Sequence, residues 1–388
     1  MLRIGIVAGE ASGDQLGADL IAALRRRFPT LIVEGMAGPR MRELGCGALA
    51  TTEELSVMGI VEVAKHYRRL RALRERLISH FLASPPDLFV GIDVPDFVLH
   101  IEARLKAAGV LTAHYVCPQV WAWREGRVAI IRRATDLVLT LFPFEAPFLQ
   151  ARNVNATYVG HPLADRLPLM VDRKAARAAL ELDSNGTYVA LLPGSRRQEY
   201  ARHQELFLRT ARALWQTLPH VKFLYGAVNP QAGARVRQAL ARAGEGLPIE
   251  IVMGRSLETL SAADAALCAS GTVTLEAALT KTPAVVTYRM AALSFAILRR
   301  LVKTRWVALP NLLTNRPLMP ELLQEAATAP ALAAALRAWL TDAAACDVYR
   351  TACLELHHLL RNNAAEAAAA ALADLVRARS SPCAAYNP

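Results

Sequence analysis

Short apolar runs alternate with longer amphipathic segments along most of the chain. In the first half, the segments with the character of strands are LRIGIVA (2–8), LIVEGMA (31–37), PDLFVGID (86–93), LTAHYVC (111–117) and DLVLTLF (136–142). Segments with helical spacing separate them, for example PDFVLHIEARLKAAG (95–109). Apolar strands that alternate with helices in this way indicate a parallel sheet covered by helices on both faces.

The alternation restarts after about residue 165. The second set of expected strands is TYVALLP (187–193), VKFLYGA (221–227), IEIVMG (249–254), DAALCAS (264–270) and TPAVVTY (282–288). We therefore predict an α/β protein with two doubly wound, Rossmann-like domains that face each other across a cleft. The alanine-rich stretch from 331 to 378 is predicted to be helical. Ligands should bind at the carboxyl ends of the strands, where loops enter helices.

Composition and charge narrow the class of protein. The chain has 388 residues, enough for two domains, and its net charge of +11 indicates an anionic partner unless the arginine excess reflects genome composition. It has no uncharged apolar run of about 18 residues and no signal-peptide layout, so we expect no transmembrane helix and no secretion. The six cysteines lie far apart and mostly in apolar contexts, which is typical of reduced thiols in a cytoplasmic protein.

The loop after the first expected strand, GEASGDQLG, is a candidate site. Its small residues expose backbone N–H groups at a helix start, which suits an anion. The carboxylates of Glu10 and Asp14, beside Ser12, suit sugar hydroxyls instead, and ordinary helix capping by Ser12 or Asp14 is the alternative. The G-x-G-x-x-G spacing is missing, so a dinucleotide site is not supported.

Two further loops of the first half carry candidate side chains. Asp93 ends a strand just before Val94-Pro95, where its carboxylate could take a proton from an attacking hydroxyl, while Asp96 is placed to cap the next helix. The alternative is that both aspartates are caps. The loop HYVCPQVWAWR contributes three more side chains, which are Gln119, Trp121 and Trp123. Its aromatic rings either bind an acyl chain or sugar face, or pack between the domains.

The second half offers a candidate nucleotide site. In LLPGSRR, the turn at Gly194 and Ser195 with Arg196 would form a diphosphate cradle, unless Arg196 is an ordinary surface residue. No Walker motif occurs, which disfavours that type of ATPase. In ASGTVTLE, the donors to a phosphate would be Ser270, Gly271 and Thr272.

An acid and an amide complete the candidate nucleotide site. Glu276 lies about one turn into the helix that follows Thr272, where it could accept hydrogen bonds from ribose hydroxyls; it lies one residue too far along for a capping box. Asn311, an amide among apolar residues, either holds the nucleotide base or bonds to backbone.

Six blocks in order, VAGEASGD, GIDVPDF, HYVCPQVWAWR, LLPGSR, ASGTVTLE and LPNLL, resemble the lipid-A-disaccharide synthase family over about residues 3 to 375. Val94 and Gln119 stand where relatives often have Ala and Ser, and the tail SPCAAYNP has no counterpart. The resemblance implies a GT-B glycosyltransferase fold. It assigns acceptor and lipid binding to residues 1–165 and UDP-sugar binding to residues 166–345. Residues 346–378 would form a helix that returns to the first domain, and residues 379–388 would be a loose tail.

The resemblance also implies a reaction. UDP-2,3-diacylglucosamine and 2,3-diacylglucosamine 1-phosphate (lipid X) would give the lipid A disaccharide 1-phosphate and UDP, with inversion and with neither cofactor nor metal. Asp93 would be the general base, Glu10 would lie near the sugar, Arg196 would neutralise the leaving diphosphate, Glu276 would bind the ribose, and Asn311 would line the nucleotide pocket.

Lipid substrates agree with the basic character of the chain. The segments 57–82 and 292–306 mix apolar and basic residues, as a helix at a membrane surface does, although a helix packed on the sheet is the alternative for 57–82. We expect a cytoplasmic homodimer bound peripherally to anionic lipids of the inner membrane. Another GT-B enzyme or a UDP-sugar epimerase would lack the tryptophan loop. Nucleic-acid binding is disfavoured because the charge is scattered and no recognition motif occurs.

Overall fold

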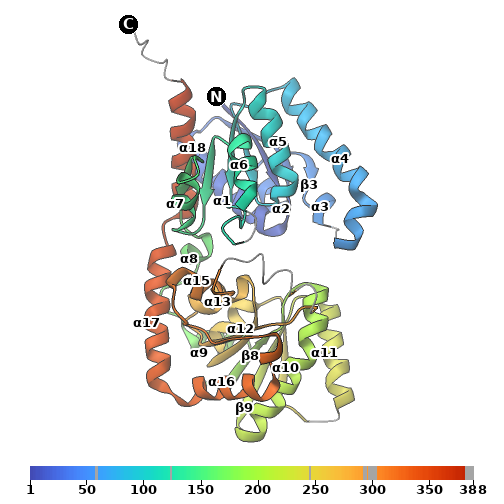
Figure 1. The fold of residues 1–388 in the computed structure, drawn as a ribbon, viewed down its shortest axis with the longest axis vertical. Coiled ribbons are helices and arrows are strands. Elements are labelled where there is room, and N and C mark those ends of the chain that lie inside the picture. The colour runs from blue at the N-terminus through green and yellow to red at the C-terminus, as the bar shows by residue number, and fades with distance from the viewer. Residues whose placement is uncertain (57–59, 123–124, 244–245, 292–294, 296–303, 381–388) are drawn as a thin grey trace. The chain divides into compact units, whose positions relative to one another are not determined.

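The computed structural model describes residues 1–56, 60–122, 125–243, 246–291, 295 and 304–380. Its contacts divide the chain into two compact units (Figure 1). The N-terminal unit is Met1–Asp165 together with Leu360–Pro388, and the C-terminal unit is Arg166–Leu359. No helix among the described residues is long and apolar enough to cross a membrane.

The N-terminal unit is built on a seven-stranded parallel sheet with the order β3-β2-β1-β4-β5-β6-β7. The strands are β1 (Leu2–Ala8), β2 (Leu31–Ala37), β3 (Gly47–Thr51), β4 (Leu88–Ile92), β5 (Leu111–Tyr115), β6 (Leu137–Thr140) and β7 (Ala156–Tyr158). The longer helices are α1 (Ala11–Arg27), α4 (Ile60–Ala83), α5 (Pro95–Ala107) and α18 (Ala364–Ser380). The shorter ones are α2 (Pro39–Glu43), α3 (Glu53–Ser56), α6 (Val128–Ala134), α7 (Glu145–Gln150), α8 (Pro162–Arg166) and the 3₁₀ turn η1 (Glu125–Arg127).

Alternate residues of these strands feed two separate cores, one on each face of the sheet. Ile6 and Val90 pack with α1 and α18 on one face, whereas Val7 and Phe89 pack with α4 and α5 on the other. Figure 1 shows α18, which comes last in the chain, lying along the N-terminal unit. Because both faces are covered, the strands read as continuous apolar runs rather than as alternating ones.

The C-terminal unit contains a six-stranded parallel sheet with the order β10-β9-β8-β11-β12-β13. Its strands are β8 (Thr187–Leu192), β9 (Val221–Ala227), β10 (Ile249–Met253), β11 (Ala265–Ala269), β12 (Ala284–Tyr288) and β13 (Glu321–Leu323). Its helices are α9 (Arg173–Ala179), α10 (Arg197–Thr217), α11 (Pro230–Ala243), α12 (Ser256–Ala262), α13 (Thr272–Leu279), α15 (Leu309–Thr314), η2 (Gln324–Ala326), α16 (Ala329–Thr341) and α17 (Ala343–Leu360). Helices α10, α11 and α16 pack on one face, and α9 and α12 pack on the other.

Each sheet reverses its strand order at one point. In the N-terminal unit the reversal falls between β1 and β4, and in the C-terminal unit it falls between β8 and β11. The loops after two such neighbouring strands diverge to opposite faces, which opens a binding position at the carboxyl edge. The candidate loops that contain Glu10, Asp93, Arg196 and Thr272 follow these four strands.

The C-terminal segment differs from the expected single helix over 346–378. Two helices are present, because α17 ends at Leu360 and α18 begins at Ala364. Asn363 between them has a left-handed backbone, with φ of 49°, which stops a helix. The carboxylate of Asp165 then accepts hydrogen bonds from the backbone N–H groups of Asn362, Asn363 and Ala364 at 3.0, 2.9 and 2.6 Å, and so caps α18. Of the expected loose tail, 379 and 380 belong to α18, and 381–388 lie outside the described residues.

Candidate functional site

The turn after β4 holds Asp93 in an unusual backbone conformation. Asp93 and Val94 both have left-handed φ angles, 54° and 44°, although neither is glycine. Such strain persists only where the surroundings impose it. Here the Asp93 N–H donates to the Tyr115 carbonyl at 2.9 Å, and Pro95 starts α5. The carboxylate of Asp93 is half-buried and, among the described residues, makes no hydrogen bond or ion pair.

Neither aspartate of this turn caps α5, so the expectation for Asp96 is wrong. The N-cap position is Val94, and no side chain caps the helix. Instead, Asp96 pairs with Arg127, at the end of the loop that follows β5. Asp93 is therefore held in place with its carboxylate available, which is what a proton acceptor needs.

The loop after β1 lies against this turn. A Cβ atom added to Gly9 would come within 2.4 Å of the Val94 side chain, so the two loops touch here and a larger residue would force a side chain to shift. Glu10, the last residue before α1, and Ser12, in its first turn, are exposed, and no side chain caps α1. The two loops thus bring the Glu10 and Asp93 segments together at one edge of the sheet.

Asp14 does not take part as expected. It is 3% exposed, and its two oxygens accept hydrogen bonds from the backbone N–H groups of Arg40 and Met41 at 3.0 and 3.1 Å. Its carboxylate therefore caps α2 rather than binding a sugar. The local sequence contains no sign of this partner, because Arg40 follows 26 residues later.

The loop between β5 and α6 contains the remaining acceptor-site candidates. Gln119 is exposed and Trp121 is half-buried, while Trp123 lies outside the described residues. The indole N–H of Trp121 donates to the Glu145 carboxylate at 3.0 Å, and the Trp121 ring meets Phe144 edge-on at 5.0 Å between centroids. Nothing in the sequence predicts a role for Glu145.

In the C-terminal unit, the turn after β8 presents Arg196 to solvent. Gly194 has φ of 113°, which favours glycine, and Ser195 is exposed. The side chain of Arg196 is 84% exposed, and its contact among the described residues is a long one to Glu199 at 3.6 Å. The guanidinium is thus available to an anionic ligand at the start of α10.

His203 of α10 contacts the end of β12, and nothing in the sequence singles it out. Its ring is fully buried on α10, and Nε2 accepts a hydrogen bond from the Arg289 N–H at 2.9 Å. The ring also lies 5.1 Å from that of Tyr288, the last residue of β12. Burial lowers the pKa of His203, which keeps Nε2 free to accept that bond.

The turn after β11 exposes two of the three residues expected to bind phosphate. Gly271 and Thr272 are exposed at the start of α13, and the Ser270 hydroxyl donates to the Val307 carbonyl at 3.0 Å. Glu276 is half-buried, and one of its carboxylate oxygens is buried without a hydrogen-bond partner. Burial raises the pKa of Glu276, and a hydrogen bond from Ser256 opposes that rise. A buried acceptor of this kind requires donors, and ribose hydroxyls are donors of the right type.

Asn311 follows the backbone alternative rather than the nucleotide one. It is fully buried, and its amide donates to the Met319 carbonyl and to Glu321, both at 2.8 Å. Its oxygen accepts from the Met319 N–H, also at 2.8 Å. The amide thus closes the loop between α15 and β13, with its donors and its acceptor all used within the protein.

The structure describes only part of the segment 57–82. Residues 57–59 lie outside the described residues, as does most of 292–306. In the described part of α4, Leu73, Leu77 and Phe81 are buried against the sheet, so that this stretch is an amphipathic helix packed on the domain. Its arginines face solvent, and the exposed ones are Arg68, Arg69, Arg71 and Arg76.

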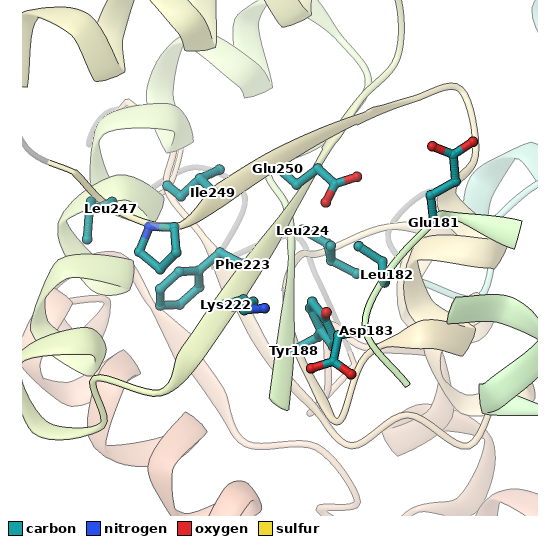
Figure 2. Close-up of a pocket in the computed structure, with 11 residues that line it drawn as sticks. Glu181, Leu182, Asp183, Tyr188, Lys222, Phe223, Leu224, Leu247, Ile249 and Glu250 are labelled. Atoms are coloured by element: carbon teal, nitrogen blue, oxygen red, sulfur yellow. The ribbon is translucent and has the colours of Figure 1, made fainter. Parts of the chain in front are cut away.

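A pocket of about 420 Å³ lies at the amino ends of strands in the C-terminal sheet, away from the candidate loops at their carboxyl ends. Figure 2 shows Tyr188 and Lys222, near the amino ends of β8 and β9, together with Glu250 of β10. All the candidate nucleotide residues lie at or beyond the carboxyl ends of strands, so this pocket is not part of their site. Among the described residues, no group of His, Cys, Asp or Glu is placed to hold a metal ion.

Two Rossmann-like units, each with polar loops at its reversal point, define the class of GT-B glycosyltransferases and related UDP-sugar epimerases. Solved structures agree in fold. The UDP-GlcNAc 2-epimerase from Neisseria meningitidis bound to UDP-GlcNAc has a TM-score of 0.66 at 11% identity, covering 96% of this chain and 100% of that chain. The glycotransferase of kitacinnamycin has a TM-score of 0.62 at 17% identity, covering 96% and 98%. At these identities the likeness shows the fold alone.

Sequence comparison identifies the family. The model of the family described as lipid-A-disaccharide synthetase matches residues 4–373. The lipid-A-disaccharide synthase of Hahella chejuensis is 47% identical over 380 residues, covering 97% of this chain and 94% of the relative. That of Alkalilimnicola ehrlichii is 49% identical over 375 residues, covering 96% and 98%. The chain belongs to the lipid-A-disaccharide synthase family of glycosyltransferases, which confirms the resemblance, the fold class and the prediction of an enzyme.

Proposed function

We propose that this protein transfers a 2,3-diacylglucosamine unit from its UDP derivative to the 6-hydroxyl of lipid X, with inversion. The observation that carries the proposal is the available carboxylate of Asp93, held by a strained turn at the reversal point of the N-terminal sheet. Membership of the family supports the lipid substrates, and the exposed residues after β8 and β11 support a UDP-sugar donor.

The chemistry is a single displacement. Asp93 takes the proton of the acceptor hydroxyl while that oxygen forms a bond to the anomeric carbon of the donor. The bond between this carbon and the diphosphate oxygen breaks, and UDP leaves with the electron pair. Attack from the face opposite the leaving group inverts the configuration. Glu10, in the loop that touches the Asp93 turn, would bind sugar hydroxyls, as would Ser12.

The C-terminal unit would hold UDP. Arg196 and the N–H groups near Gly194 and Ser195 stabilise the charge that develops on the diphosphate. Gly271 and Thr272, in the turn after β11, donate to phosphate oxygens. Ser270 is not proposed as a donor, because its hydroxyl and its N–H already donate to the Val307 and Thr287 carbonyls. Glu276 accepts hydrogen bonds from the ribose. Asn311 is no longer proposed as a ligand, because its amide is fully used within the protein.

The setting of the reaction is also part of the proposal. Both substrates are lipids, and the exposed arginines of α4 provide an attraction to anionic headgroups of about 1 kcal/mol each. We place the protein at the cytoplasmic face of the inner membrane, bound peripherally, as a homodimer. High salt should therefore release it from vesicles that contain anionic lipids, and binding that ignores salt would contradict the electrostatic part.

The test replaces Asp93 by Asn and measures disaccharide formation from both lipid substrates in detergent micelles. Loss of a general base should lower kcat by roughly 10²–10⁴-fold. The dissociation constant of UDP should stay unchanged, because its residues lie in the other unit. The matched control is Asp96→Asn, which breaks a surface ion pair and should change the rate by at most about fivefold. Full activity of Asp93→Asn would remove Asp93 as the base, and a wild-type protein without this product would remove the proposed reaction.

A further inference from the structure

A buried carboxylate lies behind the loop between β5 and α6. Glu145, in the first turn of α7, is 2% exposed, and no step of the proposed reaction uses it. Buried acids are rare unless they are hydrogen-bonded, so its partners indicate what it does.

Each oxygen of Glu145 holds a different segment. Oε1 accepts the indole N–H of Trp121 at 3.0 Å, and Oε2 accepts the backbone N–H of Phe142 at 3.0 Å. Phe144 lies edge-on against the indole and closes the other side. The carboxylate therefore joins the loop after β5 to the turn between β6 and α7.

The other attachments of this loop are weaker or lie at its ends. Val116 enters it with a left-handed φ of 84°. Near its far end, Glu125 pairs with Arg152 at 2.7 Å, and Arg127 pairs with Asp96, but these pairs are partly exposed. Exposed ion pairs contribute little, whereas hydrogen bonds to a buried charge are among the strong ones. In the described middle of the loop, Val120 is buried in the adjoining core, and the bond from Trp121 to Glu145 is the polar attachment beside it.

We propose that Glu145 is a positioning residue for the acceptor lipid, acting by fixing Trp121 so that the loop presents Gln119 and the indole in one arrangement. The inference rests on the proposed function, because the acceptor role of this loop is part of it. It adds a residue that contacts no substrate and controls how one of the substrate-binding loops is held.

The charge of Glu145 should matter because of its surroundings. Burial raises its pKa to about 7, although the hydrogen bonds from Phe142, Trp121 and Leu141 oppose the rise. On the loop side it faces the Cys117 thiol, whose pKa is raised by burial and by Glu145, and on the other side His161 stacks on Phe142 at 5.6 Å. A protonated Glu145 has one oxygen that donates, so either Trp121 or Phe142 loses an acceptor. Above about pH 7 the ionised Glu145 fixes the loop between β5 and α6, and below that pH the protonated acid fixes it less tightly.

The experiment compares Glu145→Gln, Trp121→Phe and the double variant in steady-state assays from pH 5.5 to 8.5. Glu145→Gln keeps the size of the side chain but loses the charge and one acceptor, and should raise KM for lipid X roughly tenfold or more. The KM for the UDP-sugar should not change. Wild type should show a rise in acceptor KM below about pH 7, and both single variants should lack it. The control Glu125→Gln removes a partly exposed ion pair of the same loop and should leave acceptor KM and its pH profile near wild type.

The double variant tests whether the two residues act together. Glu145→Gln with Trp121→Phe should be no worse than the poorer single variant, because both remove the same hydrogen bond. Additive losses, or an unchanged acceptor KM in Trp121→Phe and Glu145→Gln with intact circular dichroism, would overturn the positioning role. If Glu145→Gln unfolds, the pH profile of Trp121→Phe decides: loss of the rise in acceptor KM below about pH 7 supports the positioning role, and a profile like that of wild type overturns it. A wild type that makes no disaccharide contradicts the proposed function instead.

Discussion

The unpartnered carboxylate oxygen of Glu276 leads to opposite predictions for ligand binding and for stability. The substitution Glu276→Gln keeps the shape of the side chain and removes its charge. Hydrogen bonds to a charged group contribute about 1.5–3 kcal/mol. If the ribose of UDP supplies the missing donors, the dissociation constant of UDP should rise roughly 10- to 150-fold, since 1.4 kcal/mol is a factor of ten.

The free protein should respond in the other direction. Burial raises the pKa of Glu276, so the ionised form is less favourable in the folded state than in the unfolded chain. At neutral pH that difference lowers the free energy of unfolding, and removing the charge should recover part of it. The melting temperature of ligand-free Glu276→Gln should therefore be equal to or above that of wild type.

Calorimetric titration with UDP and with 2′-deoxy-UDP separates ribose recognition from general damage. Wild type should bind the deoxy analogue more weakly, and Glu276→Gln should hardly distinguish the two nucleotides. UDP affinity of wild type should fall on acidification, beginning at a higher pH than for an ordinary carboxylate, because the pKa of Glu276 is raised. A variant that discriminates between the nucleotides as well as wild type does would refute the assignment of Glu276 to the ribose.

Two further predictions concern the N-terminal unit. Asp165→Ala removes the acceptor of three backbone N–H groups at the start of α18, so the unit should lose about 1–2 kcal/mol of stability, and amide hydrogen exchange in α18 should accelerate; unchanged exchange there would contradict the capping role. Gly91→Ala places a Cβ 2.0 Å from Val98 and 2.2 Å from the buried carboxylate of Glu102. The free energy of unfolding measured in urea should fall by about 1–3 kcal/mol. An unchanged free energy of unfolding would show that α5 can shift away.

The sequence pattern identifies the central strands better than the edge strands. Five of the predicted runs correspond to β1, β2, β4, β5 and β6, because strands covered on both faces need continuous apolar residues. The strands β3, β7 and β13 lie at sheet edges and were not predicted. They have only three to five residues, and β3 and β13 are largely half-buried or exposed, so no apolar run marks them.

Predictions for the site succeed or fail according to where the partner of each residue lies. The candidate loops could be placed because each follows an apolar strand directly in the sequence. The fates of Asp14 and Asn311 could not be predicted, since their partners are set by tertiary packing. Glu145 escaped notice for the same reason, as Trp121 precedes it by 24 residues. Local sequence patterns predict which loop or helix carries a side chain, but they do not predict its tertiary contact partner.

The position of α18 has a consequence for synthesis of the protein. Ala368, Ala369 and Leu372 of this helix are fully buried in the same core as β1, yet the whole C-terminal unit, Arg166–Leu359, is translated between them and the sheet they cover. At roughly 5–20 residues per second, that interval lasts on the order of 10–40 s. Throughout it, the part of this sheet face that α18 covers, beside α1, remains exposed, and a chaperone could bind there. A ribosome that stalls before α18 would release a chain in which part of the N-terminal core stays exposed to solvent.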